Sequence, residues 1–146
     1  EPTATVFSLG NGIATNDNSG GGEEHIAYCF HSVDGFSKVG SYVGNGSTDG
    51  TFVYTGFRPK MIIWKRTNVS GQSWEILDTE RDPYNGVTHY LYPDTSGAEN
   101  NATGYPQDFL SNGFKIRHTG ASANASGGNY IYLAFAEQPF KYSNGA

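Results

Sequence analysis

Short runs of aromatic and β-branched residues, each bounded by glycine, asparagine, proline or serine, recur along this chain and constrain its fold most strongly. The most apolar of them are Lys60–Arg66 (KMIIWKR) and Tyr130–Glu137 (YIYLAFAE). No segment sustains the helical period of about 3.6 residues. The chain also has 20 Gly, which turn the backbone, and 10 Tyr, 9 Phe and 2 Trp, which pack on a pleated surface. This pattern predicts an all-β fold, an antiparallel two-sheet sandwich or jelly roll of roughly 8–10 short strands with little or no helix.

The same pattern predicts which runs pair. Lys60–Arg66 is expected to be a central strand paired with Trp74–Asp78, and Tyr130–Glu137 a central strand between two layers. Three further pairings or strands are expected: a hairpin of Val39–Gly44 with Thr51–Thr55 across Asn45–Gly50, a hairpin of Phe109–Leu110 with Phe114–Arg117, and strands at Thr5–Leu9 and His25–His31.

Charge and cysteine content narrow the classes of function. The net charge is −5 and no Lys/Arg-rich run is present, so nucleic acid is not an expected partner. The longest strongly apolar run, Met61–Trp64, is far too short to cross a bilayer, so no membrane insertion is expected. Cys29 is the single cysteine and falls in an apolar run. It is expected to be a buried small hydrophobic residue in a chain that folds in a reducing cytosol.

Two parts of the chain echo each other about 105 residues apart. Near the N-terminus, Phe7–Leu9, a Gly/Asn-rich loop and Ile26–Phe30 follow one another. Near the C-terminus, Phe114–Ile116, a similar loop and Ile131–Phe135 repeat this order. The echo predicts a single β domain over 1–146 in which 1–38 resembles the closing hairpin of a preceding repeat and 39–146 form one full module. Since residue 1 is Glu, the chain is expected to be processed, trimmed or a segment of something longer.

Eight motifs in fixed order resemble one known family. They are His25–Phe30 (HIAYCF), Gly35–Tyr42 (GFSKVGSY), Gly44–Gly50 (GNGSTDG), Tyr54–Pro59 (YTGFRP), Ile62–Thr67 (IIWKRT), Asp78–Asn85 (DTERDPYN), Asp108–Ile116 (DFLSNGFKI) and Tyr132–Glu137 (YLAFAE). Together they are similar to a repeat module of virion structural proteins of tailed, often marine, bacteriophages, found in tandem in tail- or appendage-associated chains.

The resemblance implies a non-enzymatic structural protein of a phage particle, and it transfers no catalytic residue. The expected role is a module of a tail fibre, appendage or capsid decoration that assembles through repeated subunit contacts. Expected partners are other copies of the chain and other virion proteins. The expected location is the particle surface, after synthesis in the host cytoplasm. The alternative is a carbohydrate-binding adhesin domain that recognises host surface glycans.

Aromatic residues in the irregular middle of the chain are the candidate contacts for a glycan or for another subunit. They are Trp74, Tyr84, Tyr90, Tyr92 and Tyr105. Aromatic rings beside Asp and Asn suit sugars, because the ring stacks on the apolar sugar face while polar groups bond the hydroxyls. The alternative is that these rings cap the ends of the sandwich or pack at a subunit contact.

Asp78, Glu80 and Asp82 alternate along the chain and would point the same way on an extended segment. Oxygen ligands of this kind could bind Ca²⁺, although a solvated strand end beside Arg81 is the favoured interpretation and no cofactor is expected otherwise. The histidines at 25, 31, 89 and 118 show no metal-binding spacing and are interpreted as single surface or core residues. No Gly-x-Ser-x-Gly elbow is present. A glycosidase pair of carboxylates, which would be spatial, stays open.

Overall fold

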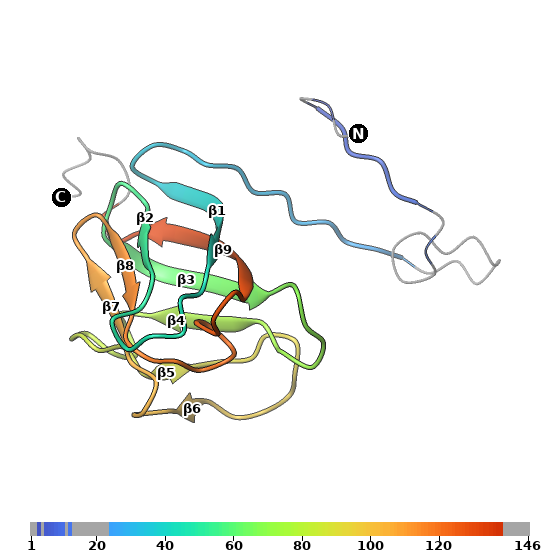
Figure 1. The fold of residues 1–146 in the computed structure, drawn as a ribbon. Helices are drawn as coiled ribbons and strands as arrows, with labels where there is room; N and C mark the ends of the chain where they lie inside the picture. Colours follow the sequence, from blue (N-terminus) through green and yellow to red (C-terminus); the bar gives the residue numbers. More distant parts are fainter. Residues whose placement is uncertain (1–2, 4, 11, 13–23, 139–146) are drawn as a thin grey trace. The chain divides into compact units, whose positions relative to one another are not determined.

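The computed structural model describes residues 3, 5–10, 12 and 24–138, and this part of the chain is all β with no helix. The chain divides into two units, Glu1–Phe30 and His31–Ala146, and every strand among the described residues lies in the second. The strands, drawn in Figure 1, are β1 (Ser37–Val43), β2 (Phe52–Tyr54), β3 (Pro59–Arg66), β4 (Glu75–Asp78), β5 (His89–Tyr90), β6 (Asn100–Asn101), β7 (Gln107–Leu110), β8 (Gly113–Ile116) and β9 (Asn129–Ala136).

Two antiparallel sheets form the body of the second unit. One has four strands in the order β1-β9-β3-β4, and the other has three in the order β2-β8-β7. A small third sheet pairs β5 with β6. All the pairings are antiparallel. The predicted class, an antiparallel all-β sandwich, is therefore confirmed.

The core lies between the two larger sheets because alternate side chains of their strands point inward. In β3 these are Ile62 and Trp64, both 0% exposed. From the opposite sheet, Phe114 of β8 places its ring 6.0 Å from Trp64 and 5.4 Å from Tyr132 of β9, centroid to centroid. The expectation that β9 is covered on both faces is wrong, since Ile131 on its outer face is 40% exposed. Its central place in the sheet, between β1 and β3, is confirmed.

Two of the predicted hairpins are present and one is not. β3 pairs with β4, and β7 with β8, as their alternation and turn residues predict. The hairpin of Val39–Gly44 with Thr51–Thr55 is wrong, because β1 pairs with β9 and β2 with β8. The connection Asn45–Gly50 crosses from one sheet to the other instead of reversing within one.

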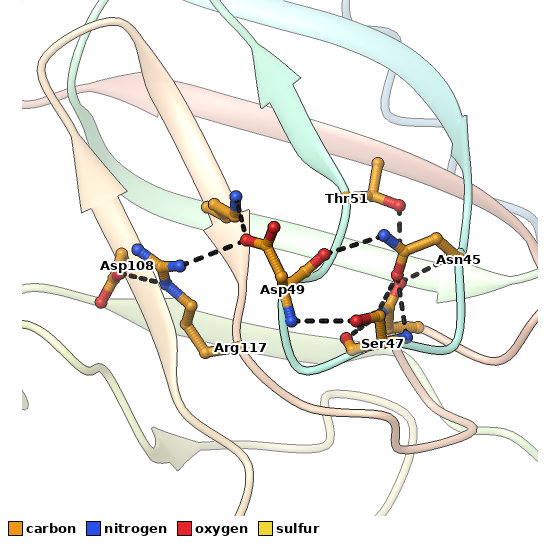
Figure 2. A network of polar contacts seen from close by, with 8 residues as sticks. Asn45, Ser47, Asp49, Thr51, Asp108 and Arg117 are labelled. Carbon is orange, nitrogen blue, oxygen red and sulfur yellow. Dashed lines mark hydrogen bonds and ion pairs between the residues drawn. The ribbon is translucent and has the colours of Figure 1, made fainter.

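A buried asparagine explains this crossing. Asn124, 0% exposed, accepts a hydrogen bond from the Asn45 backbone N–H at 3.0 Å and donates to the Ser47 carbonyl at 2.8 Å. At the other end of the loop, Asp49 pairs with Lys115 at 2.6 Å and with Arg117 at 3.7 Å (Figure 2). The loop is thus fixed to β8 and to the chain that follows it, and it cannot act as a simple turn.

Expectations for the N-terminal segment differ from the structure. The described residues of Thr5–Leu9 and His25–His31 form no strand, and Ile26 and Tyr28 are each 79% exposed. Cys29 is exposed rather than buried. Alternation alone predicted these strands, but a strand also needs a neighbour that satisfies its backbone groups, and alternation supplies none.

Candidate functional site

At one end of the sandwich, polar residues instead of apolar ones occupy the inward-facing positions. Glu75 precedes buried Leu77 by two residues in β4, and Gln107 precedes buried Phe109 by two in β7. His118 follows buried Ile116 by two, just beyond β8. These polar residues are 3–4% exposed. Strand alternation therefore directs a carboxyl, an amide and an imidazole into the space between the two sheets.

These three side chains line a pocket of about 290 Å³ together with three tyrosines. The remaining lining residues are Gln72, Ala121 and Ser122. Tyr90 ends β5, and Tyr90 and Tyr92 flank Leu91, whose backbone exchanges two hydrogen bonds with Ile76 of β4 at 2.9 and 3.0 Å. This bridge holds both rings beside the strand that carries Glu75.

The tyrosines form two contacts within the pocket. The Tyr92 hydroxyl donates to the Tyr90 hydroxyl at 3.4 Å, with the rings edge to face at 5.2 Å. Burial raises the pKa of Tyr90, so its hydroxyl stays protonated at neutral pH. Tyr105, 50% exposed, sets its ring edge to face with His118 at 5.0 Å. The pocket thus offers aromatic surface and hydroxyl groups from its floor to its rim.

Glu75 is the carboxyl group in the pocket lining. Trp64 donates its indole N–H to Glu75 Oε2 at 2.9 Å, and Ser122 also bonds the carboxyl. Burial raises the pKa of Glu75, and these two hydrogen bonds partly oppose the rise. A buried carboxylate so held keeps further lone pairs for a ligand, since it can accept about four hydrogen bonds.

His118 and Gln107 contact each other at the base of the pocket. His118 Nδ1 accepts the Gly120 backbone N–H at 2.9 Å, and His118 Nε2 lies 2.9 Å from Gln107 Nε2. Burial lowers the pKa of His118 to about 4, so the ring is neutral at pH 7. The other terminal atom of Gln107, Oε1, is buried without a hydrogen-bond partner among the described residues.

Three of the five predicted aromatic residues meet in this pocket, namely Tyr90, Tyr92 and Tyr105. Trp74 and Tyr84 are not in its lining. Trp74 is half-buried, with Lys65 Nζ 5.8 Å from its ring centroid. Tyr84 is 84% exposed.

The three carboxylates considered for calcium have separate partners. β4 ends at Asp78 and residues 79–81 form a turn, so the extended geometry behind that hypothesis does not occur. Asp78 pairs with Arg81 at 2.9 Å, and Glu80 pairs with Lys60. Asp82 accepts the backbone N–H groups of Thr88 and His89 and bonds the His89 ring at 2.7 Å. Within the described ranges, no cluster of three or more His, Cys, Asp or Glu residues could hold a metal ion.

Comparison with known proteins adds one finding. Residues 1–139 match the model of a protein family described as a domain of unknown function (DUF7483). The chain belongs to this family. No curated protein and no solved structure matches it. The described residues also contain no helix long and apolar enough to cross a membrane.

Sequence reasoning missed the polar half of the site in this DUF7483 domain. Glu75, Gln107 and His118 belong to three separate segments and share no motif. One signal was available. Each is a polar residue in phase with the buried apolar positions of the strand that contains it or, for His118, of the strand that precedes it. This phase marks the point where an inner face leaves the core.

Proposed function

We propose that this chain is a non-enzymatic module of a bacteriophage particle surface and that it binds a host surface glycan in the pocket of Tyr90, Tyr92, Tyr105, Glu75 and Gln107. The placement on a phage rests on the motifs that resemble virion repeat modules. The binding role rests on one observation, the meeting of tyrosine rings with a buried carboxyl and a buried amide in one cavity.

The chemistry of this lining suits a sugar. Aromatic rings contact the apolar C–H face of a pyranose, while a carboxylate and an amide bond its hydroxyls with defined direction. The volume of about 290 Å³ is near the lower end of the usual range for ligand pockets, about 300–1,000 Å³, so one sugar ring is the expected occupant. Glu75 is the single carboxyl group among the lining residues, which supports binding rather than hydrolysis, because glycosidases generally use two.

A glycan array tests this function. We expect selective binding that Tyr105→Ala weakens about two- to tenfold, since an aromatic contact contributes about 0.5–1.5 kcal/mol beyond its buried area. Tyr84→Ala is the matched control, because this tyrosine is exposed and lies outside the pocket lining. Failure to bind any glycan, or equal losses in the two variants, would contradict the proposal.

Assembly into a larger structure is the second candidate, and the N-terminal segment favours it. Ile26, Tyr28 and Phe30 are 79%, 79% and 55% exposed. In the sequence echo they correspond to Ile131, Leu133 and Phe135 of β9, which lies between two strands. Apolar residues of a strand-like pattern suit pairing with a sheet edge of another copy. Light scattering tests this role: a defined oligomer is expected, and a stable monomer at high concentration would argue against it.

A further inference from the structure

The proton on His118 determines how the pocket presents its amide. The Gly120 backbone N–H can only donate, and it points to His118 Nδ1 at 2.9 Å. Nδ1 must therefore carry the lone pair. In a neutral imidazole the proton then resides on Nε2, which becomes a donor.

Gln107 has to accept that proton. Its side chain meets His118 Nε2 at 2.9 Å, and of its two terminal atoms only the amide oxygen can accept a hydrogen bond. The two ends of a glutamine amide have the same shape, so the hydrogen-bond network decides which faces which. The oxygen accordingly faces His118, and the NH₂ group occupies the buried position that receives no hydrogen bond from the described residues.

The pocket therefore presents a donor and an acceptor of fixed kind. Gln107, 3% exposed, places its amide NH₂ group at the position that receives no hydrogen bond from the described residues, so this group can donate to a ligand. Glu75, 4% exposed, retains lone pairs beyond those bonded by Trp64 and Ser122 and can accept a further hydrogen bond from a ligand. A ligand that supplies an acceptor for Gln107 and a donor for Glu75 satisfies both groups, and each such hydrogen bond contributes about 0.5–1.5 kcal/mol.

We propose that the pocket recognises the acetamido group of an N-acetylated sugar: the ligand carbonyl accepts from Gln107, the ligand N–H donates to Glu75, and the methyl group packs on Tyr90 or Tyr92. A trans amide carries a donor and an acceptor that point in opposite directions within one rigid plane, together with an apolar methyl, and a hydroxyl offers no such combination. The half-exposed ring of Tyr105 is at the rim, where the pyranose ring would lie. This inference rests on the proposed glycan-binding function.

A panel of methyl glycosides tests the inference on the unaltered protein, with affinities measured by calorimetry or NMR titration. The probes are the N-acetylglucosamine, N-acetylgalactosamine, glucosamine and glucose forms. We expect an N-acetylated form to bind at least tenfold more tightly than both the amine and the hydroxyl form of the same ring. Equal or tighter binding of glucose or glucosamine would overturn the acetamido assignment and leave the glycan function standing. Failure of all four probes and of the glycan array would overturn both.

Variants of Gln107 and His118 provide a second test. Gln107→Glu still accepts from His118 but replaces the donor by a second acceptor, so the preference for the acetamido form should disappear. His118→Asn keeps an acceptor for the Gly120 N–H but cannot hold Gln107, so the same preference should shrink severalfold. The readout is the ratio of the affinity for the N-acetylated glycoside to the affinity for the hydroxyl form of the same ring. A general loss of folded protein does not change this ratio. An unchanged ratio in both variants would refute the inference.

Discussion

Trp64 donates its indole N–H to Oε2 of Glu75 at 2.9 Å, and this hydrogen bond joins the largest fully buried side chain to the carboxyl group of the pocket. Core and site therefore share one polar contact. Trp64 is 0% exposed, so its N–H has no access to water and needs the carboxyl as partner. Any substitution at Glu75 that removes the acceptor is expected to destabilise the fold as well as the site.

Glu75→Gln separates the charge of this group from its role as acceptor, because the amide oxygen can still accept from Trp64. The raised pKa of Glu75 means that the folded protein holds this proton more tightly than the unfolded chain does. Its contribution to stability is thus present below the ordinary pKa of 4.5 and is lost as the pH rises through the higher folded-state pKa. We expect the free energy of unfolding of the variant, relative to the unaltered protein, to increase from pH 4 to pH 8 in denaturant titrations.

Glu80→Gln is the control for this measurement, since Glu80 is an exposed residue paired with Lys60. The free energy of unfolding of Glu80→Gln, relative to the unaltered protein, should show no comparable increase from pH 4 to pH 8. A flat difference for Glu75→Gln over the same range would contradict the burial effect on its carboxyl.

His118 gives a pH dependence of the opposite sign. Its pKa falls from 6.5 to about 4 on folding because burial disfavours the charged ring. The unfolded chain then takes up a proton that the folded protein does not, so stability decreases as the pH drops from 6.5 toward 4. At about 1.4 kcal/mol for each pKa unit, the full loss is about 3 kcal/mol.

His118→Asn should remove this dependence while keeping an acceptor for Gly120. The difference in unfolding free energy between variant and unaltered protein should therefore narrow toward pH 4, as measured by chemical denaturation. His25→Asn, at an exposed position, is the control variant. Its free energy of unfolding should depend on pH in the same way as that of the unaltered protein. If the free energies of unfolding of His118→Asn and of the unaltered protein change with pH in parallel, the His118 ring is not desolvated by folding.

Local pattern was sufficient to predict the strands of the two larger sheets, but it wrongly predicted strands near the N-terminus and was insufficient for one of the pairings. Lys60–Arg66 and Trp74–Asp78 are close in sequence, and their turn brings them together as β3 and β4. Val39–Gly44 has a plausible local partner too, but its real partner is β9, far along the chain. The deciding contact is Asn124, whose bond to the Asn45 backbone spans 79 residues. No local signal encodes such a contact.

The site was predictable in part for a related reason. Tyr90, Tyr92 and Tyr105 are aromatic residues in a region without a regular strand pattern, and these two features were enough to select them as candidates. Glu75 and Gln107 lie in strands, and a polar residue in a strand is normally expected to face solvent. Only the pairing of the strands shows that these two side chains face inward. The placement of both in one pocket depends on how the two sheets stack, which the sequence pattern does not specify.

Replacing Asn124 by alanine is expected to destabilise the second unit by about 2–4 kcal/mol. The variant would leave the Asn45 N–H and the carbonyl oxygens of Ser47 and His118 without their buried partner. Thermal and denaturant unfolding measure the loss. Asn129→Ala, an exposed asparagine at the start of β9, is the matched change and should cost well under half as much. Similar losses at the two positions would argue against the anchoring role of Asn124.

Gly120→Ala tests how the rim of the pocket is set. A Cβ at this position would lie 2.6 Å from Tyr105 Cε1 and 2.8 Å from His118 Nδ1, closer than side chains tolerate. The Tyr105 ring must therefore shift from its present position, and glycan affinity should fall about tenfold, the equivalent of about 1.4 kcal/mol. Gly104→Ala is the control beside the same tyrosine, because its Cβ would meet no atom within 4 Å. If the two variants bind an array-selected glycan with equal affinity in a titration, Tyr105 is not part of the binding surface.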